Sequence, residues 1–215
     1  MEQPQPHPSE VHLIGLNGPP GCGKTKIGFE LARALGATVI RPGDHLKRAA
    51  HRLFGLSDPP LAHESDKDVP TASLDGRTWR YVYQRLSEGF FKPLFGADYF
   101  GRLAAKEIRQ AVREGQRRFI VEFGFEVELQ AIAHGIAPWA PGGRIADHEP
   151  CRLLLVRLHR HGRDFRHDPR DYLRDWPYGV FVPGTADRAF DVTNDGTVEE
   201  TVAAILAEYR QRMGP

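Results

Sequence analysis

One eight-residue segment constrains this chain more than any other. Residues 18–25 read Gly-Pro-Pro-Gly-Cys-Gly-Lys-Thr and follow the apolar run VHLIGL at 11–16, with only Asn17 between them. This is the G-x-x-x-x-G-K-[ST] pattern in its meaningful setting, between an expected strand and an expected helix. A chance glycine-rich turn would not match every fixed position in that setting. The sequence therefore predicts a phosphate loop.

Each residue type in the loop has a chemical reason. Glycines at 18, 21 and 23 let successive backbone N–H groups turn toward phosphate oxygens. Lys24 can reach the β- and γ-phosphates, the Thr25 hydroxyl can ligate Mg²⁺, and the helix that starts there adds its positive end. ATP and Mg²⁺ are therefore the expected cofactors. The residues predicted to bind them are Gly18, Pro19, Pro20, Gly21, Cys22, Gly23, Lys24 and Thr25.

Composition excludes several other classes of protein. Of 215 residues, 40% are hydrophobic and 27% charged, which is typical of a folded globular chain. The net charge is +1, so no global charge draws the chain to nucleic acid or to a membrane. Two cysteines suggest no disulfide framework, and no apolar run is long enough to span a membrane. We expect a cytoplasmic protein whose residues 1–10 form a flexible tail before a single domain at 11–215.

Strand and helix patterns alternate along that domain. Strands are expected at 11–16, 37–40, 118–123, 151–158 and 189–192. Helices are expected at 24–35, 45–54, 77–89, 98–114, 125–134 and 197–212. This alternation predicts an α/β fold with a parallel sheet, whose ligands bind at the carboxyl ends of the strands.

Two carboxylates stand at expected strand ends. Asp44 is interpreted as an N-cap of the following helix, as the group that aligns or deprotonates an acceptor, or as both. Glu122 is either a solvated strand terminus or the second metal-directed residue beside Thr25.

Two further clusters have both a structural and a functional interpretation. The arginines at 157, 160, 163, 166 and 170 form either a solvated basic surface or a lid in which one or two stabilise the transferred phosphoryl group. The aromatic residues Trp79, Tyr81, Tyr83, Phe90 and Phe91 are mostly expected in helix packing, although one or two could stack on an acceptor base.

Several segments in order along the chain resemble the deoxynucleoside monophosphate kinases of bacteriophages. These segments are the phosphate loop, GDHLK at 43–47, RTWR at 77–80 with Gln84, GADYF at 96–100, GFEVE at 124–128, DPR at 168–170 and NDGT at 194–197. The resemblance covers residues 12–206. It implies a P-loop kinase fold with a parallel five-stranded sheet, helices on both faces, an acceptor-binding insertion at 55–100 and a mobile basic lid at 159–175.

The resemblance also assigns roles to residues. It places Asp44, Lys47, Arg80, Gln84 and Glu128 at the acceptor. Together with the phosphate loop it predicts that Lys24, Asp44 and Arg163 are catalytic, and that Thr25 and Glu122 hold the metal. The chain departs from the family at the end of the third strand, where Glu122 and Gly124 replace an aspartate and an arginine.

That departure bears on the acceptor. A neighbouring phage branch phosphorylates the hydroxymethyl group of 5-hydroxymethyl-deoxyuridine in DNA, and such an acceptor needs no arginine clamp on a 5′-phosphate. We therefore expect DNA containing hydroxymethyluracil as the acceptor, in the host cytoplasm if the chain is phage-encoded. The alternatives are a kinase of free deoxynucleoside monophosphates and, from another class, an ATPase or nucleotide-switch module. The sequence does not predict an oligomeric state.

Overall fold

One parallel sheet organises the molecule. The computed structural model describes residues 10–56, 65–136, 151–166, 168, 170–173 and 189–214. Its five strands pair in the order β2-β3-β1-β4-β5, and every neighbouring pair is parallel. The strands are β1 (Val11–Asn17), β2 (Thr38–Ile40), β3 (Arg118–Glu122), β4 (Cys151–His159) and β5 (Phe190–Thr193). The predicted α/β class and the five-stranded parallel sheet are confirmed.

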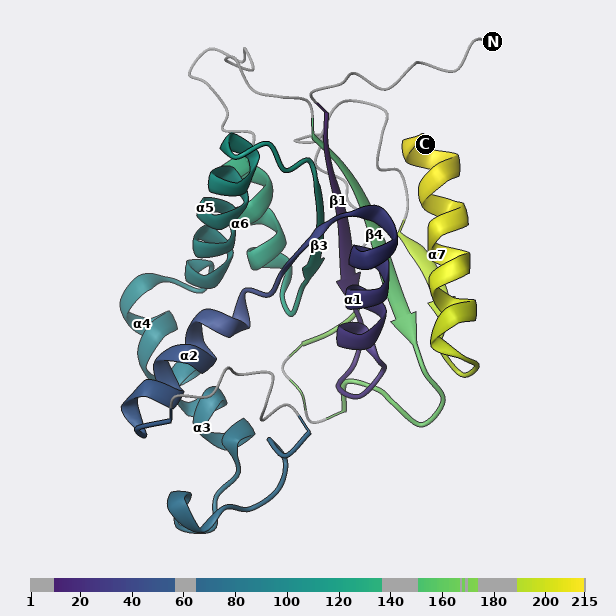
Figure 1. Cartoon of the computed structure of the whole chain (residues 1–215). Helices are drawn as coiled ribbons and strands as arrows, with labels where there is room; N and C mark the ends of the chain where they lie inside the picture. The colour runs from purple at the N-terminus through teal and green to yellow at the C-terminus, as the bar shows by residue number, and fades with distance from the viewer. Residues whose placement is uncertain are drawn as a thin grey trace.

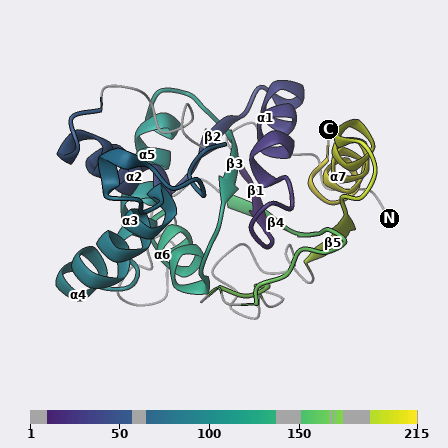
Figure 2. The same cartoon turned by 90° about the horizontal axis from the view of Figure 1, so that it is seen from below.

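Helices cover both faces of this sheet, as predicted (Figure 2). α1 (Lys24–Leu35) and α7 (Val198–Met213) share a buried core with β1 and β4 on one face. α5 (Tyr99–Arg113) and α6 (Glu126–Ile136) build the core on the other. All seven residues of β1 are buried. This explains its almost continuous apolar run, because a central parallel strand has no solvent face.

A third group of helices forms an arm beside the sheet. It contains α2 (Gly43–Leu53), α3 (Trp79–Leu86), a π-helical turn (Ser87–Phe91) and α4 (Lys92–Phe95). Its own small core includes Trp79 and Tyr83. The Tyr83 hydroxyl lies 2.6 Å from Nε2 of His51, a buried hydrogen bond that joins α3 to α2.

The helix predicted at 77–89 has different limits in the structure. Thr78 caps α3 by accepting a hydrogen bond from the Tyr81 N–H, so the helix begins at Trp79. Beyond Leu86 the chain continues through the π-helical turn into α4. Pro93 has no N–H to donate to the carbonyl four residues earlier, which is consistent with a change of helix type just before it.

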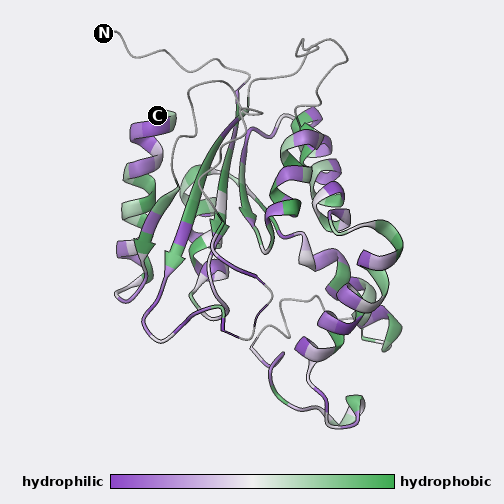
Figure 3. Cartoon of the chain, turned by 180° about the vertical axis from the view of Figure 1, so that it is seen from behind, coloured by the Kyte–Doolittle hydropathy of each residue, from purple (hydrophilic) through white to green (hydrophobic). Residues whose placement is uncertain are grey.

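The arm and the segment after β4 lie at the end of the sheet where the strands point, together with the phosphate loop (Figure 1). The described residues between 160 and 173, which directly follow β4, are mostly hydrophilic (Figure 3). Parts of three predictions lie outside the described residues: the tail at 1–9, residues 57–64 of the insertion, and residues 167, 169, 174 and 175 of the lid. Among the described helices, none combines the length and apolar character that crossing a membrane requires.

Candidate active site

The phosphate loop connects β1 to α1 in the predicted setting. Gly21 and Gly23 have φ of 76° and 100°, conformations that side chains disfavour. Gly23 also has no room for one, because a Cβ there would lie 2.5 Å from Nδ2 of Asn194. That Nδ2 donates a 2.7 Å hydrogen bond to the Cys22 carbonyl, and Oδ1 of Asn194 accepts one from Thr201 at the start of α7. The buried Asn194 side chain therefore links the phosphate loop to α7. We call this link the brace of the loop.

Lys24 is folded back onto its own loop. Its ammonium donates to the carbonyl oxygens of Gly18 and Pro19, at 2.5 and 2.9 Å. Burial lowers the pKa of Lys24 by removing water from the charged form, and the nearby Arg170 charge acts in the same direction. A phosphate group would offset this unfavourable environment with its negative charge. The site is thus electrostatically suited to an anion.

Two carboxylates and an arginine meet beside the loop. Glu122 accepts a hydrogen bond from the Thr25 hydroxyl at 3.4 Å, and its other oxygen lies 3.3 Å from Nε of Arg41. The same Nε lies 3.6 Å from Oδ1 of Asp44, which is also 3.6 Å from the ammonium of Lys47. β2 and β3 are adjacent, so the residues that follow them converge.

This group suits a magnesium ion. Oδ1 of Asp44 and Oε1 of Glu122 are buried and accept no hydrogen bond from the described residues. A hydroxyl and carboxylates are the oxygen ligands that Mg²⁺ prefers. No set of three His, Cys, Asp or Glu side chains within the described ranges could hold a metal alone. Thr25 and Glu122 would therefore share the ion with water and phosphate oxygens, as is usual for Mg²⁺.

The structural role considered for Asp44 is wrong. α2 begins at Gly43, its N-cap is Pro42, and no side chain caps it. Pro42 already has helical dihedral angles, so the helix starts two residues before the position that an Asp44 cap would require. The Asp44 carboxylate faces Arg41 and Lys47 instead.

The arginine series divides into two groups. Arg160 donates to the Gly21 carbonyl at 3.4 Å, and a Cβ on Gly21 would lie 3.2 Å from the guanidinium carbon of Arg163. The predicted catalytic Arg163 therefore lies over the phosphate loop. Three other arginines are ion-paired with neighbouring aspartates: Arg157 with Asp191, Arg166 with Asp164, and Arg170 with Asp168. Their charges are neutralised locally, so the series is not an open basic stripe.

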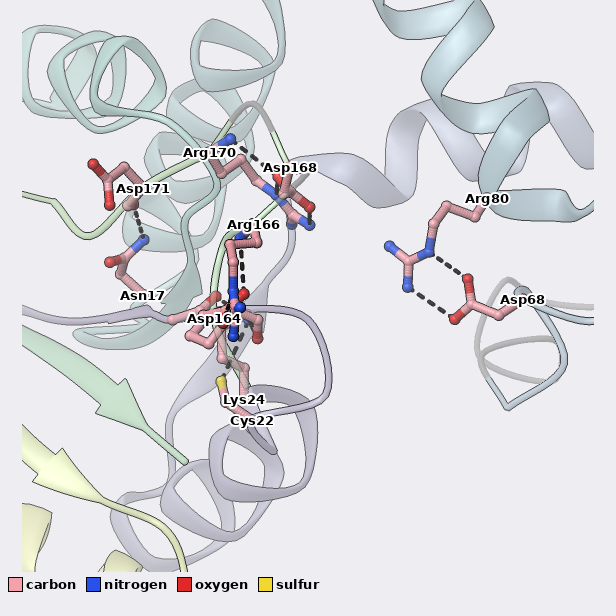
Figure 4. Close-up of polar contacts among 12 residues, drawn as sticks. Asn17, Cys22, Lys24, Asp68, Arg80, Asp164, Arg166, Asp168, Arg170 and Asp171 are labelled. Carbon is pink, nitrogen blue, oxygen red and sulfur yellow. Dashed lines mark hydrogen bonds and ion pairs between the residues drawn. The ribbon is translucent and has the colours of Figure 1, made fainter. Parts of the chain in front are cut away.

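The other residues predicted to bind the acceptor lie in different environments. Arg80 on α3 is ion-paired with Asp68 and also contributes to lowering the pKa of Asp168 (Figure 4). Gln84 is exposed on the same helix. Glu128 is buried at the start of α6 and accepts the N–H groups of Gly124 and Phe125 at 3.1 and 3.2 Å. Burial raises the pKa of Glu128. The structure thus shows a helix-capping role for Glu128, while its predicted acceptor role stays a prediction.

The aromatic residues of the arm also divide. Trp79 and Tyr83 belong to the arm's core, as expected. Tyr81 is 43% exposed, with the guanidinium of Arg77 5.8 Å and that of Arg85 6.0 Å from the centre of its ring. It is therefore the ring in α3 that remains accessible for stacking.

Sequence reasoning gave no role to two residues that shape the site. Arg41 bridges Asp44 and Glu122; its place directly after a strand was the available signal. Asn17, the last residue of β1, is fully buried. It accepts the Leu173 N–H at 3.0 Å and donates to the Asp171 carbonyl, which ties residues 171–173 to the strand before the loop. Fold and site together define a P-loop kinase architecture.

Comparisons with known proteins were made against families, sequences and structures. No family model matches the chain. The chain is 28% identical over 159 residues to a tRNA dimethylallyltransferase from Syntrophobacter fumaroxidans. That match covers 72% of this chain but only 42% of the relative's length.

Among solved structures, the chain is similar to a gluconokinase from Sinorhizobium meliloti 1021, with 17% identity, 94% of each chain covered and a TM-score of 0.42. A shikimate kinase from Acinetobacter baumannii in complex with shikimate has 15% identity, 94% coverage of each chain and a TM-score of 0.44. An APS kinase from Mycobacterium tuberculosis has 12% identity, 92% and 95% coverage, and a TM-score of 0.41. The fold assignment rests on this chain's own strand order and phosphate loop.

Proposed function

We propose that this protein is an ATP-dependent phosphotransferase that moves the γ-phosphate of ATP to a nucleotide-level acceptor. The observation that carries the proposal is the meeting of Thr25, Glu122, Arg41 and Asp44 beside the phosphate loop. A phosphate loop alone serves many NTPases. A second carboxylate, that of Asp44 at the start of α2, lies beside Arg41 and adds the group that an acceptor hydroxyl requires.

Each residue has a defined task in this proposal. The Lys24 ammonium leaves the Gly18 and Pro19 carbonyls and binds phosphate oxygens of the donor. Mg²⁺, held by Thr25 and Glu122, supplies positive charge to the phosphates when it is bound. Asp44 accepts the proton of an attacking hydroxyl or, for a phosphate acceptor, orients it through Lys47. Arg163 over Gly21 stabilises negative charge that develops on the transferred group.

The acceptor is proposed to be a deoxynucleotide, in one of two forms. The hydroxymethyl group of 5-hydroxymethyl-deoxyuridine in DNA was favoured by Gly124 and by the arginine series. In the structure, however, the Arg170 side chain lies over Gly124, and three arginines of the series are ion-paired. Both features favour a free monophosphate, because an arginine side chain lies against position 124 and the charge for following a DNA backbone is reduced.

A second function follows from the sequence relative. The similar protein from Syntrophobacter fumaroxidans is named for dimethylallyl transfer to tRNA. The 28% identity over 159 residues supports group transfer to a nucleic acid as the competing reaction, with the arm around Tyr81 as the base-stacking surface.

One experiment separates these functions. Labelled ATP is offered with free deoxynucleoside monophosphates, with DNA containing hydroxymethyluracil, with the same DNA containing thymine, and with no acceptor. A parallel reaction contains tRNA and dimethylallyl diphosphate. Transfer to monophosphates supports the free-nucleotide kinase, whereas transfer that requires hydroxymethyluracil supports DNA modification. Phosphate release without any acceptor, or prenylation of tRNA, would overturn the kinase.

Variants identify the site. Lys24→Ala should reduce transfer by at least about 10²-fold, because electrostatic stabilisation is the main contribution of such enzymes. Lys26→Ala removes the same charge from an exposed position two residues further on and should change the rate by less than about 3-fold. Full activity of Lys24→Ala would contradict the assignment.

A further inference from the structure

The Arg170 side chain packs against Gly124, the second residue after β3. A Cβ built on Gly124 would lie 3.2 Å from Cδ and 4.0 Å from Cγ of Arg170. Gly124 is not among the glycines with positive φ, so its backbone would accept another residue. A Cβ there would be in tighter contact than usual and would push the stem of the Arg170 side chain aside. Because Gly124 has no side chain, the Arg170 side chain can pack against its backbone. We call Gly124 the seat of Arg170.

The guanidinium of Arg170 is held by a bidentate contact. Its Nε and Nη2 donate to the two carboxylate oxygens of Asp168 at 2.6 and 2.5 Å, and its backbone N–H donates to the same carboxylate at 3.0 Å. The side chain of Asp168 is 9% exposed and that of Arg170 24% exposed. Although burial opposes it, this hydrogen bonding lowers the pKa of Asp168. The two-oxygen fork is the geometry with which arginine also binds phosphate.

The position of this pair relates it to both sides of the site. The Arg170 charge contributes to the lowered pKa of Lys24 in the phosphate loop. Arg80 on α3 acts on the pKa of Asp168 from the other side. Asn17 at the end of β1 ties the following residues 171–173 in place. Figure 4 shows the Arg170–Asp168 pair on the phosphate-loop side and Arg80 on the arm.

We propose that Arg170 is a phosphate-binding residue of this site, seated by Gly124, and that Asp168 occupies its guanidinium until a phosphate replaces the carboxylate. The inference rests on the proposed function. It goes beyond that function in assigning the contact to Arg170 and the competing anion to Asp168. Arg163 and Arg170 both follow β4 but contact different parts of the site, since Arg163 lies over Gly21 and Arg170 lies against Gly124.

The chain contains a matched control for this pair. Arg166 bonds to Asp164, two residues before it, just as Arg170 bonds to Asp168. The side chain of Arg166 is 83% exposed. Arg166→Ala therefore deletes an ion pair with the same sequence spacing that is far more exposed to solvent than the Arg170–Asp168 pair.

The first test measures ligand binding without an acceptor. Thermal stabilisation by Mg-ATP and by inorganic tripolyphosphate is compared for the wild type, Arg170→Ala, Arg170→Lys and Arg166→Ala. We expect both Arg170 variants to lose at least half of the stabilisation by tripolyphosphate, since lysine cannot make the bidentate contact. Arg166→Ala should keep it. Equal stabilisation of Arg170→Ala and Arg166→Ala would overturn the proposal.

The second test measures turnover in variants of Arg170, Gly124 and Asp168. With the acceptor that the labelled-ATP experiment identifies, Arg170→Ala should lower kcat about 10²-fold or more. Gly124→Ala should produce part of that loss by displacing the Arg170 stem. Asp168→Asn should lower the KM for the phosphate ligand, because the competing charge is removed. An unchanged KM in Asp168→Asn with a normal kcat in Gly124→Ala would refute the inference. If the wild type binds tripolyphosphate but transfers nothing, the proposed function fails, and the binding test still decides the role of Arg170.

Discussion

The brace behind the phosphate loop yields a quantitative prediction. Asn194 is 4% exposed, and its amide joins the Cys22 carbonyl to the Thr201 hydroxyl. Asn194→Ala removes both contacts. The Thr201 hydroxyl can still donate to the Thr197 carbonyl at 3.2 Å, so the main loss is a buried Cys22 carbonyl without its donor. Such a loss costs about 1–3 kcal/mol. With about 2–4 °C per kcal/mol for a chain of this size, Tm should fall by about 2–12 °C.

The loop should lose its shape as well as its support. The N–H groups between Gly21 and Gly23 are aimed by the backbone that Asn194 holds, so we expect Asn194→Ala to weaken ATP binding about 10-fold. Thermal unfolding gives the first quantity, and titration with a fluorescent ATP analogue gives the second. The control is Asp195→Ala, which removes an exposed contact to the His161 N–H and should shift Tm by less than about 2 °C. Equal Tm values for the two variants would refute the reasoning. Lost stability with unchanged ATP affinity would show that the loop keeps its shape without the brace.

Three further predictions concern charge and packing. Burial holds the pKa of Lys24 below its ordinary 10.5, so the native state binds fewer protons than the unfolded state between those two values. The free energy of unfolding should therefore rise with pH across that interval. Urea unfolding of Lys24→Met should not show this rise, and parallel pH profiles of the two proteins would contradict the prediction. A Cβ on Gly101 would lie 2.6 Å from a backbone carbonyl oxygen of α6, so Gly101→Ala should destabilise the fold by about 1–3 kcal/mol. Gly89→Ala, which meets open space, is the control, and equal urea midpoints would count against the close helix contact. Tyr83→Phe leaves a buried imidazole nitrogen of α2 without the hydroxyl and should cost about 1–3 kcal/mol in urea unfolding, whereas the exposed Tyr81→Phe should cost little; similar losses would refute the buried bond.

Much of the fold was predictable because each element had a local signal. The five strands lie within a residue or two of their predicted limits, since their apolar runs are short and end at turn residues. The proximity of Asp44 and Glu122 was predictable for a simpler reason. Carboxyl ends of parallel strands lie at one edge of a sheet, and β2 and β3 are neighbours.

The missed features depend on tertiary contacts. An arginine after a strand usually indicates surface, yet the side chain of Arg41 is 8% exposed because two carboxylates surround it. Gly124 suggested an absent guanidinium, whereas the structure shows Arg170, far along the chain, in contact with that position. In the arginine series, the pairs of Arg166 and Arg170 join residues only two apart in the sequence. The pair of Arg157 with Asp191 could not be predicted, because it forms across two adjacent strands. Spacing along the chain carries no information about such neighbours.

The central position of β1 has a consequence for how the protein is made. Val11–Asn17 leaves the ribosome before both of its partner strands, Arg118–Glu122 and Cys151–His159. At about 5–20 residues per second, roughly 5–20 s pass before the first partner is synthesised. During that time a mostly apolar strand, buried in the folded protein, has no partner strand, so nascent chains are open to chaperones and to aggregation. Chains released before residue 159 should be unable to bind ATP, although they already contain the whole phosphate loop.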